Sequence, residues 1–192
     1  TRSSAASDVY KRQVLDQLKL RKFCAIGEIG IDLYWDKSFL KQQQEAFQKQ
    51  IEMAISYQLP IIIHCREAFD EIFEILEQYK SQNLYGIFHC FSGSIKQAQK
   101  AVSHNFKLGI GGVITFKNGK IDQFIHKLPL ESIVLETDSP YLSPSPFRGK
   151  RNESSYLIFI LKKLSECFKI SNEKVASITT KNAMQVFKNV DF

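Results

Sequence analysis

Short apolar runs that alternate with longer segments of helical period constrain the fold of this chain more than any other feature. The runs are rich in Ile, Val and Leu, which is typical of buried β-strands, and the segments between them repeat apolar residues every three to four positions. Strands that alternate with helices predict βα units and a parallel sheet. We expect strands at residues 24–29, 61–64, 86–90, 107–111 and 133–137.

The segments between these runs predict helices that cover the sheet. Two of them place their apolar side chains on one helical face. These residues are Leu40, Phe47, Ile51, Ala54 and Ile55 in one segment, and Ala68, Phe69, Ile72, Phe73, Leu76 and Tyr79 in the next. We also expect a shorter helix after Ser94, another around 120–127, and two or three more from 154 onward, with Ser171 and Asn182 as N-caps.

Polar residues at the ends of four predicted strands favour a (β/α)8 barrel over an open doubly wound sheet. Glu28 comes at the end of the first run, His64 ends "IIIH", His89 follows "GIF", and Asp138 follows "IVLET". Periodicity alone does not separate the two folds, but barrel enzymes collect their catalytic groups from the C-terminal ends of several strands. The expected fold class is therefore α/β, a TIM-barrel-like fold with about five parallel strands present.

These four residues also form a plausible set of metal ligands. A single histidine at a strand end is more often part of the hydrogen-bonded structure than a ligand. Two imidazoles and two carboxylates that recur at strand ends are different, because such a mixed nitrogen and oxygen set suits divalent zinc, manganese or magnesium. The sequence thus predicts a metal site built from Glu28, His64, His89 and Asp138.

Strand alternation predicts how the neighbours of these residues are oriented. Adjacent strand residues point to opposite faces, so His64 is expected to face the barrel interior while Cys65 packs outward. The same reasoning places Cys90 outward. Glu136 would share the inward face with Asp138, two residues further along.

Arg66 has two readings. It lies two residues beyond His64 and would share its face if the strand stays extended, where its planar cation could bind a phosphate. A surface arginine at the start of the next helix fits the charge placement equally well.

The glycine-rich segment "GIGGVITF" at 109–116 does not predict a nucleotide site. It lacks the GxxxxGK[ST] spacing of a phosphate-binding loop. Close backbone approach or a tight turn explains its glycines better.

Composition sets broader limits. At 192 residues and 44% hydrophobic, the chain can bury the core of a single domain, and no stretch has the ~20 apolar residues of a membrane span. Its four cysteines include no CxxC pair, which predicts reduced thiols and a cytoplasmic protein. The net charge of +6 is compatible with a nucleic-acid partner without requiring one. We expect no obligate protein partner.

The ordered motifs resemble the TatD family of metal-dependent deoxyribonucleases. They are "AIGEIGID", "LPIIIHCRE", "GIFHCFSGS", "LGIGGVITF", "IVLETDSPYL", "RGKRNE" and "TTKNAMQVF", and they cover residues 24 to 188. The resemblance implies exonucleolytic hydrolysis of DNA with one or two divalent ions, Mg²⁺, Mn²⁺ or Zn²⁺. It implies that Glu28 bridges two metal positions, that His64 and His89 bind one, and that Asp138 binds the other and acts with Glu28 in catalysis. Arg66 and Glu136 would support the ligands or contact the substrate.

The sequence departs from this family at its beginning. The family's first strand carries a His-x-His pair, and no two of the four histidines here are two residues apart. We therefore expect residues 1–13 to be a foreign or disordered stub, and residues 14–192 to be the C-terminal portion of a single TatD-like barrel domain. Two other functions stay open: hydrolysis of an amide or ester by the same centre, and a non-catalytic remnant that binds metal or nucleic acid weakly.

Overall fold

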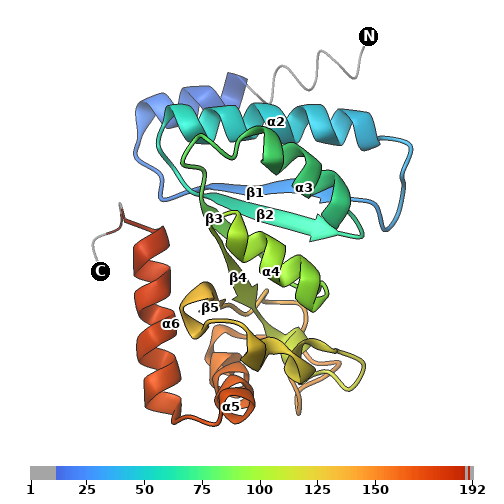
Figure 1. The fold of residues 1–192 in the computed structure, drawn as a ribbon, viewed down its shortest axis with the longest axis vertical. Helices are drawn as coiled ribbons and strands as arrows, with labels where there is room; N and C mark the ends of the chain where they lie inside the picture. The colour runs from blue at the N-terminus through green and yellow to red at the C-terminus, as the bar shows by residue number, and fades with distance from the viewer. Residues whose placement is uncertain (1–11, 189, 191–192) are drawn as a thin grey trace. The chain divides into compact units, whose positions relative to one another are not determined.

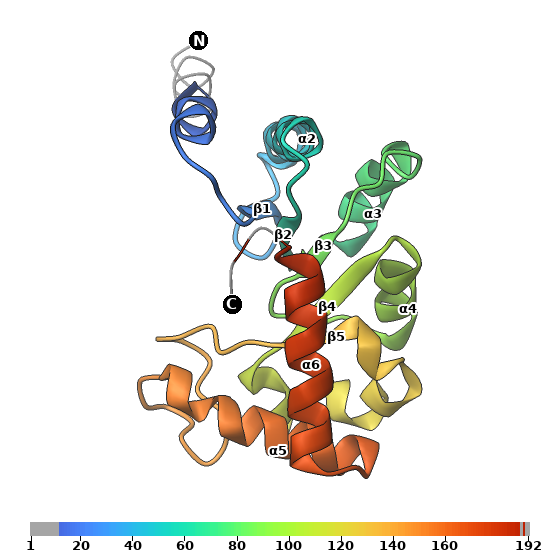
Figure 2. The same ribbon diagram turned by 90° about the vertical axis from the view of Figure 1, so that its left-hand side faces the viewer.

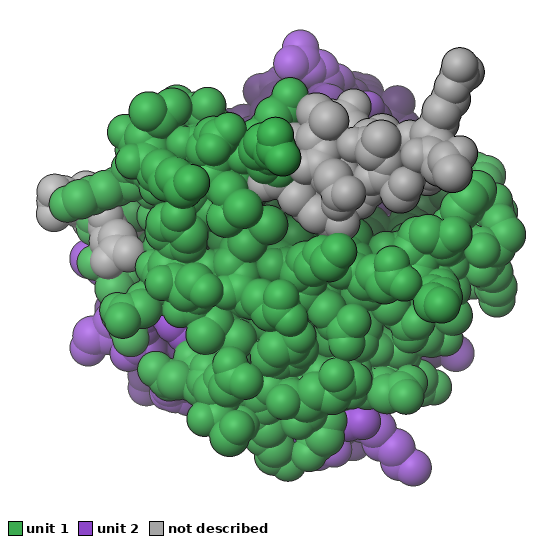
Figure 3. Space-filling model, turned by 90° about the horizontal axis from the view of Figure 1, so that it is seen from above, with its two compact units in different colours: residues 1–84, 187–191 green, residues 85–186, 192 purple. Residues whose placement is uncertain are grey.

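The structure is a computed structural model that describes residues 12–188 and 190 and forms two compact units. The first unit comprises the described residues up to Leu84 together with 187, 188 and 190, and the second comprises Tyr85–Val186 (Figure 3). The expectation for residues 1–13 lies outside the described residues except at 12 and 13, which belong to a helix at 12–20.

The first unit is built on a pair of parallel strands, β1 (Ile26–Asp32) and β2 (Ile61–Arg66). Helices α2 (Leu40–Ser56) and α3 (Phe69–Gln78) pack against these strands and against each other (Figure 1). Both helices bury the apolar face that the sequence predicts, which removes several large side chains from water. The buried residues include Phe47, Ile51 and Ala54 on α2 and Ile72, Phe73 and Leu76 on α3.

The second unit contains three parallel strands in chain order, β3 (Gly86–Phe88), β4 (Phe106–Ile110) and β5 (Ile133–Leu135). Helix α4 (Ile95–Ser103) packs on β4, and α6 (Asn172–Val186) packs on β5 and on α5 (Leu157–Phe168) (Figure 2). Short 3-10 helices fill the connection from β4 to β5 and precede α5. The expected alternation of parallel strands and helices is confirmed in both units.

The helix starts show where local sequence decided the structure. Ser94 caps α4 through a capping box, in which its hydroxyl accepts from the backbone N–H of Gln97 and the Gln97 side chain accepts from the backbone N–H of Ser94. Ser171 caps α6, since its hydroxyl accepts from the backbone N–H of Lys174. Both helix starts follow from residues within four positions of the cap.

Two helix expectations are wrong. The segment 120–127 was expected to form an α-helix, but it forms two 3-10 turns, Ile121–Gln123 and Ile125–Lys127. These turns bury Ile121 and Ile125. Asn182 is no N-cap, because it lies buried inside α6 and its side-chain amide donates to the carbonyl oxygens of Leu130 and Ile133. Tertiary hydrogen bonds therefore explain this asparagine better than local capping does.

In the parts of the chain that the structure describes, no helix combines the length and the apolar character needed to cross a membrane.

Candidate metal centre

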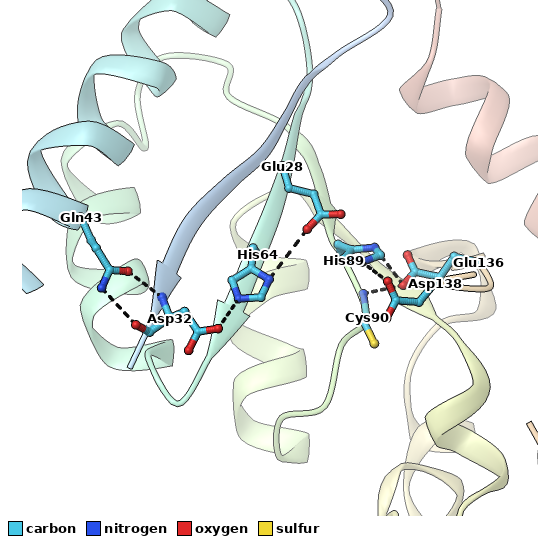
Figure 4. Close-up of polar contacts among 8 residues, drawn as sticks. All are labelled: Glu28, Asp32, Gln43, His64, His89, Cys90, Glu136 and Asp138. Atoms are coloured by element: carbon cyan, nitrogen blue, oxygen red, sulfur yellow. Dashed lines mark hydrogen bonds and ion pairs between the residues drawn. The ribbon is translucent and has the colours of Figure 1, made fainter. Parts of the chain in front are cut away.

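His64 lies between two carboxylates in the first unit (Figure 4). Its Nε2 is 2.9 Å from Asp32 Oδ2, and its Nδ1 is 3.8 Å from Glu28 Oε2. A neutral imidazole carries one N–H, so only one of its nitrogens can donate to a carboxylate. The other nitrogen turns its lone pair toward a negative charge, an arrangement that a metal cation between the two groups would stabilise.

Strand β1 places both carboxylates, although not as the sequence predicted. The strand was expected to end at residue 29 with Glu28 at its C-terminal end, but it runs to Asp32, so Glu28 lies inside it. The strand continues through Gly30 at φ +144, a conformation that favours glycine, and a Cβ there would collide with the backbone carbonyl of His64. The pairing with β2 also shifts register between Gly27 and Ile29, and such a bulge changes the direction of nearby side chains.

Asp32 belongs to this site although the pattern of polar residues at strand ends did not single it out. Gln43 on α2 fixes its backbone, since the Asp32 N–H donates to Gln43 Oε1 (2.8 Å) and Gln43 Nε2 donates to the Asp32 carbonyl (3.0 Å). Burial raises the pKa of the Asp32 carboxyl, but the Tyr34 backbone N–H, the hydrogen bond and charge of His64, and the charge of Arg66 together lower that pKa below its usual value. Asp32 therefore stays ionised and can orient the imidazole.

His89 has the corresponding environment in the second unit (Figure 4). Its Nδ1 is 3.1 Å from Glu136 Oε1, and its Nε2 is 3.2 Å from Asp138 Oδ1. Glu136 Oε1 also accepts a hydrogen bond from the backbone N–H of Cys90 at 2.5 Å. The side chains of His89 and Glu136 are only 16% and 18% exposed, so these charged contacts are screened less than surface contacts would be.

His89, Glu136 and Asp138 come just after strands β3 and β5 instead of lying within them. Strand β3 ends at Phe88 and β5 ends at Leu135, so strand alternation does not orient Cys90, Glu136 or Asp138 as expected. The backbone of Cys90 (φ +44) and of Asp138 (φ +58) is left-handed, a conformation that non-glycine residues adopt rarely and that occurs often at functional sites. The tertiary structure, not the strand period, therefore brings Glu136 and Asp138 to His89.

Asn152 supports the loop that carries Asp138 and was not singled out from the sequence. Its buried side-chain amide donates to the carbonyl oxygens of Thr137 (2.5 Å) and Tyr141 (2.6 Å). The Tyr141 N–H in turn donates to the Asp138 carbonyl at 2.9 Å. The position of Asn152 in "RGKRNE" was the available signal, although nothing in the sequence spacing shows which carbonyl groups it binds.

The two residues after His64 differ in character. Burial raises the pKa of the Cys65 thiol to about 12, so this thiol is expected to stay protonated and unreactive near neutral pH. Arg66 is exposed and is the last residue of β2. Its guanidinium carbon lies 3.6 Å from the centroid of the Tyr34 ring.

The glycines of "GIGGVITF" permit close approach, as the sequence predicted. A Cβ on Gly109 would collide with the carboxylate of Glu136, and a Cβ on Gly112 would collide with the carbonyl of Leu142. Gly109 therefore leaves the room that the Glu136 side chain occupies beside His89.

The donor types in each unit fit a divalent cation. Two ligands of one tetrahedral zinc ion lie about 3.4 Å apart, given metal–ligand distances near 2.1 Å. The His64 Nδ1 to Glu28 Oε2 separation of 3.8 Å and the His89 Nε2 to Asp138 Oδ1 separation of 3.2 Å lie on either side of this value. Among residues 12–188 and 190, no three His, Cys, Asp or Glu side chains are grouped so that they could hold an ion. Each unit thus presents one facing histidine–carboxylate pair, and the second nitrogen of each histidine contacts a further carboxylate.

Parallel strands that alternate with helices, with a histidine and a carboxylate facing each other in each unit, are typical of metal-dependent hydrolases built on a β/α barrel. A family model described as TatD related DNase matches residues 2–188, and the chain belongs to this family.

Individual relatives support the same assignment. The metal-dependent hydrolase YabD of Bacillus subtilis is 43% identical over 168 residues, which is 87% of this chain and 66% of YabD. The crystal structure of YjjV, a TatD homologue from Escherichia coli, matches with a TM-score of 0.89 and 33% identity over 96% of this chain and 71% of that one. A TatD family hydrolase from Entamoeba histolytica, 20% identical with a TM-score of 0.79 over 95% of this chain and 69% of that one, shows the fold alone. The TIM-barrel-like fold expected from the sequence is confirmed.

The chain spans about two thirds of the length of the curated relatives that it matches.

Proposed function

We propose that the protein to which this chain belongs is a divalent-metal-dependent hydrolase that cleaves DNA phosphodiester bonds from strand ends. The observation that carries this proposal is the pairing of both histidines. Each has one ring nitrogen near an orienting carboxylate, Asp32 or Glu136, and the other near a second carboxylate, Glu28 or Asp138. Membership of the TatD related DNase family supports the substrate class.

The residues of this chain have separate roles in the proposed reaction. Glu28 with His64, and His89 with Asp138, are the proposed metal ligands. A divalent cation, when bound, supplies an activated water at neutral pH and neutralises the negative charge that develops on the phosphate. Asp138, itself a proposed ligand beside His89, would also accept the proton of the attacking water as a general base.

Asp32 and Glu136 are proposed positioning residues. Metal-binding histidines usually direct their second ring nitrogen at a carboxylate, which fixes the tautomer and makes the other nitrogen a more basic metal ligand. Asp32 does this through Oδ2 at 2.9 Å from His64 Nε2, and Glu136 through Oε1 at 3.1 Å from His89 Nδ1. These contacts leave His64 Nδ1 and His89 Nε2 as the metal-facing nitrogens.

The test is hydrolysis of end-labelled single-stranded and duplex DNA by the full-length protein. The protein is treated with EDTA and then supplied with Mn²⁺ or Mg²⁺. We expect stepwise release of mononucleotides from linear DNA and no cutting of circular single-stranded DNA. Glu28→Gln should lose at least about a hundredfold in rate, since metal ligands contribute several kcal/mol to such reactions. Glu45→Gln, which changes an exposed carboxylate on α2, is the matched control.

Equal rates for Glu28→Gln and the unaltered protein would refute the proposal. Metal-dependent cleavage of small carboxylic esters without cleavage of DNA would retain the metal centre and replace the substrate.

A further inference from the structure

Two aromatic side chains and one arginine gather on an exposed surface of the first unit. Tyr34 and Trp35 follow β1 and are 46% and 81% exposed, and the exposed Arg66 ends β2. We call these three residues the aromatic platform. A tryptophan this exposed adds almost no packing energy, and clustered exposed aromatic residues commonly mark a binding surface.

The three side chains lie in contact with one another. The Arg66 guanidinium carbon is 3.6 Å from the centroid of the Tyr34 ring and 5.8 Å from that of Trp35. The two rings meet edge to face, with centroids 4.7 Å apart at an interplanar angle of 90°. A guanidinium that stacks through its face holds its N–H groups in its own plane, where they can donate to a phosphate.

Backbone contacts join the platform to the proposed metal-binding residues. The Tyr34 N–H donates to Asp32 Oδ1 at 2.9 Å, and the Leu33 N–H donates to the Arg66 carbonyl at 2.9 Å. Asp32 contacts His64 through its other oxygen. A molecule on the platform would therefore contact side chains that are two and three residues from Asp32, the carboxylate that orients His64.

We propose that the platform stacks a base of a single-stranded nucleic acid whose phosphate lies at the metal-binding residues. The inference rests on the proposed function and specifies the form of its substrate. Aromatic rings bind bases of any sequence through their π-faces, and an adjacent arginine adds a cation–π contact and binds phosphate, which is the combination found here. An unpaired base is required because bases in a duplex are already stacked on their neighbours.

Trp35 supplies a direct probe, because it is the only tryptophan among the 192 residues. The protein is kept in EDTA so that no hydrolysis occurs, and it is titrated with an eight-residue oligo(dT) and with an abasic oligomer of equal charge. We expect oligo(dT) to quench the tryptophan emission and the abasic oligomer to leave it unchanged. Trp35→Phe contains no tryptophan, so the emission that this variant retains is the background from other residues.

Affinity measured by fluorescence anisotropy of labelled oligo(dT) separates stacking from charge. Trp35→Ala should weaken binding by about tenfold without changing the slope of log Kd against log salt, because stacking releases no counterions. Arg66→Ala should reduce that slope by about 0.7, the value for one phosphate contact on a single strand. Trp35→Phe should fall between the unaltered protein and Trp35→Ala, and Leu20→Ala, which changes a side chain that is 76% exposed in the same unit, is the control.

The outcomes distinguish this inference from the proposed function. Base-dependent quenching without any metal-dependent DNA cleavage would refute the nuclease and retain the platform. Cleavage of DNA with an unchanged KM and Kd in Trp35→Ala would refute the platform and retain the nuclease. Equal quenching by the abasic oligomer would also refute the stacking role, and it would assign the surface to backbone binding alone.

Discussion

Replacing Glu136 by alanine tests whether this carboxylate holds His89 in position. The side chain is 18% exposed, and its Oε1 is the acceptor for the Cys90 N–H at 2.5 Å and lies 3.1 Å from His89 Nδ1. The alanine variant leaves both groups without this partner. A partly buried polar group that loses its partner costs about 1–3 kcal/mol, so we expect a loss of about 2 kcal/mol in the free energy of unfolding. That loss lowers Tm by roughly 4–8 °C in a chain of this size.

The effect on metal binding should be separable from the effect on stability. Loss of a carboxylate that orients a metal-binding histidine typically weakens metal affinity or activity 10- to 100-fold. Isothermal titration with Mn²⁺ at 25 °C, well below Tm, measures this affinity directly. Glu136→Gln keeps an oxygen at the Cys90 N–H but removes the charge, so it should retain more stability than Glu136→Ala while it still loses metal affinity.

A Glu136→Ala protein that binds Mn²⁺ and hydrolyses DNA like the unaltered protein would show that this carboxylate does not hold His89 in position. A protein that loses stability alone would show that Glu136 serves the Cys90 backbone and does not orient the imidazole.

Three further predictions follow from the same geometry. Folding lowers the pKa of the Asp32 carboxyl below 3.8, so the ionised carboxylate stabilises the folded chain above pH 3.8, and this stabilisation is lost as the pH falls through the pKa of the folded state. In urea titrations from pH 6 to pH 2, Asp32→Asn should therefore lose less stability on acidification than the unaltered protein. Gly109→Ala should lower activity by about tenfold or more, because its Cβ would displace the Glu136 carboxylate. Gly111→Ala, whose Cβ would meet its nearest atom at an ordinary 3.7 Å, should not lower activity, and equal activities of the two variants would show that Gly109 is not needed to make room for Glu136. Cys65, with its pKa near 12, should resist iodoacetamide at pH 8 in the folded protein and react after denaturation, as mass spectrometry of the labelled peptides would reveal.

The elements that the sequence predicted well are those whose cause is local. The apolar stripe of α2, with Phe47, Ile51 and Ala54, is visible in the 3.6-residue period, and all three residues are buried. The same holds for the cap at Ser171, whose hydroxyl accepts from the backbone N–H of Lys174 three residues away. Histidines directly after apolar runs also drew attention to His64 and His89, because polar rings are unusual there and need partners.

The errors share one physical cause, which is contact between distant parts of the chain. Asn182 looked like a helix cap, but its partners Leu130 and Ile133 are 52 and 49 residues away. The first strand was expected to end at residue 29, but it continues through Gly30, whose missing side chain lets the carbonyl of His64 approach. A short stretch of sequence around either residue does not include the backbone carbonyl groups that decide its role.

Periodicity and the cap at Ser171 depend on near neighbours, so the sequence alone predicted the order of the strands, most of the helices and the residue types that could bind a metal. Which carboxylate each imidazole nitrogen faces depends on the tertiary structure. Asp32 reaches His64 because β1 and β2 pair in parallel with a shifted register, and Glu136 reaches His89 across 47 residues because the left-handed turn at Cys90 directs a backbone N–H to the same oxygen. Hydrogen bonds between such distant groups depend on chain packing, which a local pattern does not encode.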